Sequence, residues 1–252
     1  MLRLDRVSKT YFRGGRPVAA LDNVSLSVEP GELVAILGGR GAGKTTLIKV
    51  AAGLERPDSG HVEIDSIKLD GLSDRELTHL RRTQIGCVWA SAVPVGRTAV
   101  LELVSVPLRM QSGDGRSSLV EADRALHAVG AGHCAEASLD ELSEGERQLV
   151  AIAQALVTKP RLLLLDQPVT NLRLEDEKAL LDTLRGLAAE ARVAIVMTAR
   201  HATEAVAAQT IASMTNGRLL VGDSPERPEP TAADVVQLKG RRRNSGGGTL
   251  DA

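Results

Sequence analysis

The sequence is poor in aromatic residues, which limits how the chain can pack. Of its 252 residues only three are aromatic, namely Tyr11, Phe12 and Trp89. A core must therefore be built from Leu, Val, Ile and Ala, and each aromatic side chain becomes a candidate for an individual role. Charged residues make up 25% of the chain and hydrophobic residues 43%, the balance of an ordinary globular domain. We expect one compact unit with subdomains.

Three further absences limit the functions open to the chain. Only two cysteines occur, Cys87 and Cys134, so neither a disulfide framework nor a zinc site is expected. No stretch reaches the roughly 18 apolar residues of a membrane span, and the first residues lack the apolar core of a signal peptide. The formal net charge of −1 provides no field to attract nucleic acid. We expect a protein of a reducing compartment that binds no nucleic acid and reaches a membrane only through a partner.

Hydrophobic patterning predicts alternating strands and helices. Alternation of apolar and polar residues predicts a small antiparallel sheet from two N-terminal segments, 2–7 and 21–28. Short apolar runs predict later strands at 33–37, 61–64, 85–89, 162–165 and 193–196. Helices are predicted from Lys44, from Ser73 to about Arg82, and across 175–190. Apolar strands that alternate with helices indicate an α/β fold whose largely parallel sheet is covered on both faces.

Two regions depart from this alternation. Between about 90 and 158 the pattern is mostly helical, with a polar loop predicted over 111–117, and we interpret the stretch as an inserted helical subdomain. Two capping boxes are predicted there, at Ser118/Glu121 and Ser143/Glu146. After Pro225 the composition shifts to Pro, Arg, Gly and Ser, which predicts a flexible tail over 226–252.

A glycine-rich segment between a predicted strand and a predicted helix matches the pattern G-x-x-x-x-G-K-[ST]. Its glycines let the backbone wrap around phosphates, so that successive N–H groups and the helix N-terminus face negative charge. Lys44 should reach the β- and γ-phosphates, and the Thr45 hydroxyl should bind Mg²⁺. With Thr46 beside it, the candidate nucleotide site comprises Gly38, Gly39, Arg40, Gly41, Ala42, Gly43, Lys44, Thr45 and Thr46. A glycine-rich turn without a ligand is the alternative, which the strand and helix on either side disfavour.

A second part of a phosphoryl-transfer site is the apolar strand that ends in Asp166. Its carboxylate can hold the water shell of a magnesium ion. Alone this is a weak signal, because apolar strands that end in aspartate are common. Together with the phosphate loop, it predicts a site for ATP and Mg²⁺, with Thr45 and Asp166 as the metal-site residues.

The segment Leu142 to Gln148, which reads LSEGERQ, resembles the LSGGQ signature of ABC ATPases. Nearly the whole chain follows that family's order. The segment 81–89 resembles the strand that leads into the family's Q-loop, and 98–108 resembles the segment after it in lipoprotein-release, macrolide-export and cell-division members. The resemblance implies a P-loop NTPase (RecA-like) core with a mainly parallel sheet, an N-terminal antiparallel β subdomain and the helical insertion. Residues 1–225 would then form the ATP-binding domain.

The resemblance also implies partners. In this family two subunits enclose two ATP molecules, each bound by the phosphate loop of one subunit and the signature of the other. It thus implies a second ABC ATPase subunit and an integral membrane transporter subunit, at the cytoplasmic face of the membrane. Tyr11 would stack on adenine, or serve as an ordinary strand aromatic. The residues that would meet the partner's ATP are Ser143, Glu144, Gly145 and Glu146, although Ser143 also fits a plain helix cap.

Four positions depart from the family pattern. Gln167 stands where the family has its catalytic glutamate, and loss of a general base costs about 10²- to 10⁴-fold in rate. Ala199 replaces the switch histidine, with His201 two residues further on. Ala90 replaces the Q-loop glutamine, and Arg173 replaces the D-loop aspartate. Groups that bind are retained and groups that support turnover are lost, so we expect ATP binding with weak or no hydrolysis at the chain's own site.

Two functions of different classes fit these features. The chain pairs with a competent ATPase subunit in a transporter, or it forms a non-hydrolysing homodimeric clamp that senses ATP and regulates a membrane protein. A symmetric homodimer would carry Gln167 and Ala199 in both sites, so neither could turn over. A soluble ABC protein of DNA repair or translation is disfavoured, because such proteins carry long insertions or two cassettes. An engineered Gln167 is disfavoured by the three companion losses.

Overall fold

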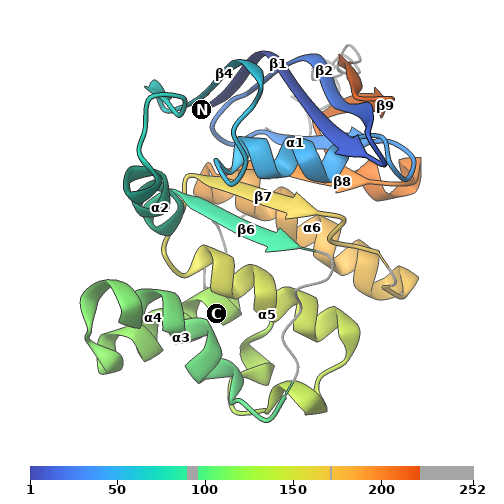
Figure 1. Cartoon of the computed structure of the whole chain (residues 1–252). Helices are drawn as coiled ribbons and strands as arrows, with labels where there is room; N and C mark the ends of the chain where they lie inside the picture. Colours follow the sequence, from blue (N-terminus) through green and yellow to red (C-terminus); the bar gives the residue numbers. More distant parts are fainter. Residues whose placement is uncertain (90–95, 171, 222–252) are drawn as a thin grey trace, which may run out of the picture. The chain divides into compact units, whose positions relative to one another are not determined.

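The computed structural model of the protein describes residues 1–89, 96–170 and 172–221. Its N-terminal part forms a four-stranded antiparallel sheet in the order β2-β1-β4-β5 (Figure 1). These strands span Leu2–Arg13 (β1), Arg16–Val28 (β2), Ser59–Ile64 (β4) and Ile67–Lys68 (β5). The small antiparallel sheet predicted from alternating apolar residues is confirmed, and its first two strands pair Leu4 with Leu26.

The second sheet has six strands in the order β10-β9-β3-β8-β7-β6. They span Leu33–Leu37 (β3), Ile85–Trp89 (β6), Leu162–Asp166 (β7), Ala194–Ala199 (β8), Thr210–Thr215 (β9) and Arg218–Val221 (β10). All neighbours pair parallel except β10, which pairs antiparallel with β9 at the edge. The predicted parallel sheet is confirmed. Parallel pairing brings the carboxyl ends of β3, β7 and β8 to one edge of the sheet, where ligands of α/β folds bind.

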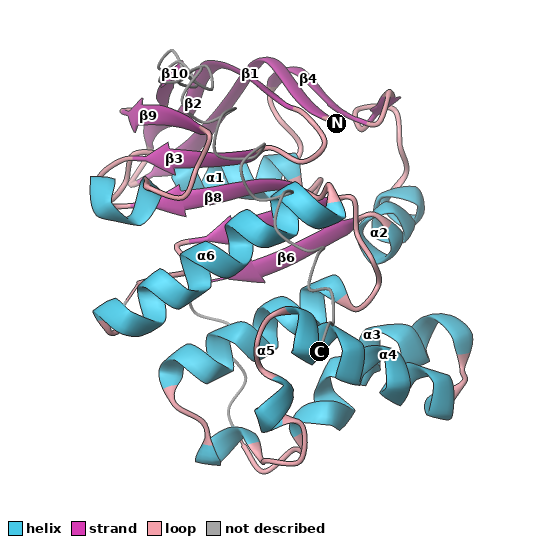
Figure 2. Ribbon diagram, turned by 180° about the vertical axis from the view of Figure 1, so that it is seen from behind, coloured by secondary structure: helices cyan, strands magenta, loops and turns pink. Residues whose placement is uncertain are grey.

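The core helices begin where the sequence signals place them. They are α1 (Lys44–Ala51), α2 (Asp74–Thr83) and α6 (Leu174–Ala191). In α2 the predicted capping box is present, since the Ser73 side chain accepts a hydrogen bond from the Glu76 N–H and the Glu76 carboxylate accepts one from the Ser73 N–H. Figures 1 and 2 show α1 on one face of the six-stranded sheet and α6 on the other.

The apolar core divides into two clusters, one on each face of this sheet. Successive side chains of a strand point to opposite faces. In β7, Leu162 and Leu164 therefore join the cluster that contains residues of α1 and the N-terminal sheet, whereas Leu163 and Leu165 join the cluster that contains residues of α5 and α6. A strand covered on both faces requires such an uninterrupted apolar run, which is why β3, β7 and β8 were visible in the sequence.

Residues 100–156 are mostly helical. The elements are α3 (Val100–Ser112), α4 (Gly115–Ala128), the short 3-10 helices η1 (Gly132–Cys134) and η2 (Leu139–Glu141), and α5 (Glu144–Leu156). A further short helix, η3 (Ala202–Ala205), follows β8. The predicted tail, 226–252, lies outside the described residues. Within the described part of the chain, no helix has both the length and the apolar character of a membrane span.

One predicted capping box is wrong. Ser118 and Glu121 do not start a helix, because Asp114 caps α4 four residues before Ser118. The Asp114 side chain accepts hydrogen bonds from the N–H groups of Arg116 (3.1 Å) and Ser117 (3.3 Å). Ser118 is buried in the first turn, where its hydroxyl donates to a backbone carbonyl instead. An aspartate satisfies the free N–H groups at a helix start as well as a serine does, so α4 begins after Asp114 and not after Ser118.

The polar loop predicted over 111–117 is also wrong. The helix α3 continues to Ser112, and α4 starts at Gly115, so only two residues connect them. Gly113 makes the connection with a left-handed φ of 70°, the usual way for glycine to end a helix. Polar composition misled the prediction, because Gln111, Arg116 and Ser117 lie on exposed helical surface.

Candidate functional site

The phosphate loop connects β3 to α1 and is held in place at both ends. The Gly38 N–H donates to the carbonyl of Ala199 at the end of β8 (3.2 Å). At the other end, Gly43 caps α1 with a left-handed φ of 110°. A Cβ atom on Gly43 would lie 2.1 Å from the carbonyl oxygen of Ala20. Only glycine fits there, so this position of the motif is fixed by backbone conformation and by close packing.

Lys44 points its ammonium group back into the loop. The residue is 5% exposed, and Nζ donates to the carbonyls of Gly38 (2.5 Å) and Gly39 (2.9 Å). Burial lowers the pKa of the ammonium group, and the nearby Asp166 carboxylate acts in the opposite direction. The cation is therefore already oriented where phosphate oxygens would replace the two carbonyls.

A chain of hydrogen bonds links the phosphate loop to β7 and β8. The Thr45 hydroxyl donates to Oδ2 of Asp166 (2.8 Å), and the Thr198 hydroxyl donates to Oδ1 of the same carboxylate (2.8 Å). The N–H of Gln167 in turn donates to Thr198 Oγ1 (2.8 Å). The two residues predicted at the metal site are thus in contact, although they are distant in sequence. A hydroxyl and a carboxylate side by side fit Mg²⁺, which takes oxygen ligands.

A cavity of about 340 Å³ lies in front of the loop, a volume within the usual range for small-molecule sites. It is lined by residues 40–46 and by Tyr11, Arg13, Val18, Ala19, Ala20, Gln167 and Arg200. The structure therefore brings Tyr11 to the same cavity as the loop. The Tyr11 hydroxyl donates to Glu55, and burial first, then this carboxylate, raises the pKa of the phenol. Glu55 was not predicted from the sequence.

Two of the positions that depart from the family pattern, Gln167 and Ala199, lie at the carboxyl ends of the neighbouring strands β7 and β8, whereas Arg173 is the N-cap of α6. Gln167 has a left-handed φ of 53°, and its Oε1 accepts a hydrogen bond from Nε of Arg200 (2.5 Å). Ala199 is fully buried as the last residue of β8. His201 is exposed and does not line the cavity, which agrees with its position past the switch residue. Ala90 lies outside the described residues.

Arg200 is a site residue that the sequence reasoning missed. It lines the cavity beside the phosphate loop, and its guanidinium contacts the residue at the position of the catalytic glutamate. The sequence did offer a signal for Arg200. It directly follows Ala199, at the end of a predicted strand, and Ala199 was already assigned to the site. A second cation beside Lys44 increases the positive potential that faces a polyphosphate.

The signature segment forms the start of α5. Ser143 is the N-cap, with the predicted capping box present: the Ser143 N–H and hydroxyl donate to Oε2 of Glu146 (2.8 and 2.7 Å). These hydrogen bonds from Ser143, and a further one from His133, lower the pKa of the Glu146 carboxyl to about 2. Gly145 is buried against α6, where a Cβ atom would lie 2.9 Å from Cγ of Asp176. Glu144 and Ser143 are exposed.

The signature segment lies away from the cavity in front of the phosphate loop. Among the described residues that line the cavity in front of the phosphate loop, none belongs to 143–146. The exposed Ser143 and the N-terminal turn of α5 are therefore available to a molecule outside this cavity. A helix N-terminus with free N–H groups attracts negative charge, but here Glu144 and Glu146 add two carboxylates to the first turn.

Comparison with known proteins identifies the family. The model of the ABC transporter family matches residues 21–170, which contain the phosphate loop, the signature and Asp166. The chain belongs to the ABC transporter family. Lipoprotein-releasing system ATP-binding protein LolD of Colwellia psychrerythraea is 32% identical over 94% of this chain and 92% of the relative. An uncharacterized ABC transporter ATP-binding protein of Mycobacterium tuberculosis is 31% identical over 94% of this chain and 96% of its own length.

Solved structures confirm the predicted fold. A dimeric ATP-binding cassette in a post-hydrolysis state, bound to ADP and Pi, superimposes with a TM-score of 0.81. It is 31% identical to this ABC cassette, and the match covers 89% of this chain and 98% of the other. The P-loop NTPase core and the assignment as an ATP-binding ABC protein, both expected from the sequence, are thereby confirmed.

Proposed function

We propose that this ABC cassette is the catalytically degenerate ATP-binding subunit of a membrane transporter complex. It would pair with a competent ATPase subunit and with an integral membrane subunit at the cytoplasmic face of the membrane. The observation that carries the proposal is the contrast within one cavity. Lys44 and Thr45 offer an ammonium group and a hydroxyl to a nucleotide, whereas the position proposed for the general base holds an amide whose oxygen accepts a hydrogen bond from Arg200.

The binding half of the site has all its parts. The loop N–H groups and the α1 N-terminus would hold the phosphates, and Lys44 would contact the β- and γ-phosphates. Thr45 and Asp166, which are hydrogen-bonded to each other, would hold Mg²⁺, and the ion would neutralise charge on the phosphates. Tyr11 lines the same cavity and offers a π face for adenine.

The hydrolytic half lacks its groups. The amide oxygen of Gln167 is a much weaker base than a carboxylate, and it already accepts a hydrogen bond from Arg200. Ala199 has no side-chain donor for a γ-phosphate, and its methyl group is buried. Water could therefore be neither activated nor oriented by these two positions, and bound ATP would persist.

A heteromeric complex explains why the signature segment keeps its helix cap. Ser143 is exposed and well positioned at the start of α5, so it could complete the ATP site of a second, competent subunit. The alternative is a homodimeric clamp that senses ATP. Native mass spectrometry of the complex from its own membrane separates the two, because only the heteromer contains a second ATPase chain.

The purified chain is expected to bind ATP and Mg²⁺ without forming ADP. Nucleotide binding can be measured by equilibrium dialysis, and the bound nucleotide can be identified by chromatography after a long incubation. Addition of the copurifying ATPase subunit should then produce turnover. Prompt formation of ADP by this chain alone would overturn the proposal.

Gln167→Glu alone is expected to raise turnover by less than about 10-fold, well short of the full contribution of a general base. The new carboxylate would lie against Arg200, whose Nε is 2.5 Å from the present side-chain oxygen. A guanidinium favours the ionised carboxylate and so lowers its basicity. Ala199 would still provide no imidazole.

The matched comparison is Gln167→Glu combined with Arg200→Ala, measured by ADP release under the same conditions. The double variant should recover more activity than the single one, because its carboxylate lacks the guanidinium partner. Large recovery from Gln167→Glu alone would show that the other lost positions do not limit hydrolysis.

A further inference from the structure

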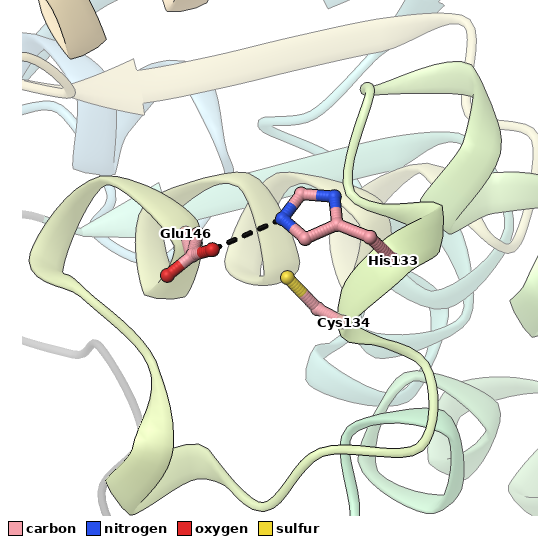
Figure 3. Close-up of side chains that lie close together, drawn as sticks. All are labelled: His133, Cys134 and Glu146. Carbon is pink, nitrogen blue, oxygen red and sulfur yellow. Dashed lines mark hydrogen bonds and ion pairs between the residues drawn. The ribbon is translucent and has the colours of Figure 1, made fainter.

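Three side chains with metal-binding atoms converge beside the signature helix. His133 and Cys134 come from η1, and Glu146 comes from the first turn of α5 (Figure 3). The imidazole nitrogen, the thiol sulfur and a carboxylate oxygen all lie within 4.8 Å of one another. Among the described residues, no other group of three or more histidine, cysteine, aspartate or glutamate side chains is close enough to hold a metal ion.

We infer that His133, Cys134 and Glu146 form a zinc site on the helical subdomain, separate from the nucleotide cavity. The donor set is one nitrogen, one sulfur and one oxygen. A thiolate selects zinc or another soft transition metal over Mg²⁺ and Ca²⁺, which take oxygen ligands. Three protein ligands leave a fourth tetrahedral position for water.

The distances fit zinc after a small adjustment. Tetrahedral zinc with these ligands places its donor atoms about 3.3 to 3.6 Å apart. His133 Nε2 is now 3.0 Å from Oε1 of Glu146, and no two of the three donor atoms are more than 4.8 Å apart. The His133 side chain is 62% exposed and can move outward, whereas Cys134 is buried and fixed. The ion can therefore enter from the solvent side, between the imidazole and the carboxylate.

Zinc would not disturb the cap of α5. Glu146 uses Oε2 for the N–H and hydroxyl of Ser143, and it presents Oε1 to His133. A metal bound through Oε1 replaces the His133 contact and leaves both hydrogen bonds to Ser143. The same carboxylate then links η1 through the metal to the helix start that carries the signature. Metal binding is expected to stiffen this start.

Metal binding displaces one proton from the protein. The zinc ion takes the place of the thiol proton of Cys134, which leaves to solvent, and it takes the lone pair of His133 Nε2. Glu146 is ionised and needs no change. Binding should therefore release a proton and strengthen as the pH rises.

Cobalt(II) titration of the purified full-length chain tests the site, because a thiolate bound to cobalt gives a near-ultraviolet charge-transfer band. The band is expected to saturate at one cobalt ion per chain and to disappear on addition of zinc. Cobalt at Thr45 and Asp166 would have oxygen ligands and would give no such band. Absence of the band at excess cobalt would overturn the proposal.

Two pairs of variants make the assignment specific. Cys134→Ala should abolish the band, whereas Cys87→Ala, at the chain's other free cysteine, should leave it unchanged. His133→Ala should weaken cobalt binding by at least about 10-fold, while His79→Ala, an exposed histidine of α2, should not. His133 lies on the surface, so its variant remains informative even if Cys134→Ala folds poorly. Retention of the band in Cys134→Ala, or unchanged affinity in His133→Ala, would sink the assignment.

Discussion

Lys44→Met is expected to weaken ATP binding by roughly 10²- to 10⁴-fold, since two charge-assisted hydrogen bonds of about 1.5 to 3 kcal/mol each are lost. Lys44 is 5% exposed, and its ammonium group donates to the carbonyls of Gly38 and Gly39. Bound phosphates would take over these donors in a site with little water, where charge interactions are strong. Methionine keeps the length of the side chain but supplies no donor.

The matched control for this variant is Lys49→Met, five residues further along α1. Lys49 pairs with Glu55 (3.1 Å) and does not line the cavity. Both variants remove one positive charge from the same helix. The difference between their ATP dissociation constants therefore reports the contact of Lys44 with the phosphates and excludes the general effect of losing a positive charge. Isothermal titration with ATP and Mg²⁺ gives both dissociation constants. Equal losses in the two variants would mean that the loop does not bind the phosphates through Lys44.

The core of the fold was predictable because it depends on local rules. Buried parallel strands need uninterrupted apolar runs, and Leu162 to Leu165 supplies one of them. The phosphate loop was equally predictable from the sequence, since Gly43 occupies a position that no other residue can take. The strands β9 and β10 were not predicted. They form at the sheet edge, where one-sided burial leaves a mixed apolar and polar pattern.

The parts of the site that were missed depend on contacts between distant segments. Arg200 meets Gln167 only because β7 and β8 are neighbours in the sheet. Glu55, in the connection between α1 and β4, meets Tyr11 of β1. The spacing of His133, Cys134 and Glu146 matches no familiar zinc pattern, and the three groups converge only when η1 packs beside α5 (Figure 3). Such contacts between distant residues depend on the whole fold, so no local sequence pattern predicts them.

Ser143→Ala is expected to lower turnover by the assembled complex roughly 10- to 100-fold, the value of one hydrogen bond to a charged phosphate. The hydroxyl lies at the exposed N-terminus of α5, where it now donates to Oε2 of Glu146 (2.7 Å). A partner's γ-phosphate would compete with that carboxylate for the same proton. The measurement is the ATPase rate of the complex with the competent subunit.

The structure provides a matched control in Ser73→Ala. Ser73 caps α2 with the same capping box, formed with Glu76 in place of Glu146. Loss of either cap should lower the free energy of unfolding by about 1 kcal/mol, which urea denaturation can verify. Only Ser143→Ala should also reduce turnover, because only α5 carries the signature. If both variants reduce turnover equally, Ser143 acts as a helix cap alone, and its hydroxyl stays hydrogen-bonded to the Glu146 carboxylate instead of donating to the partner's nucleotide.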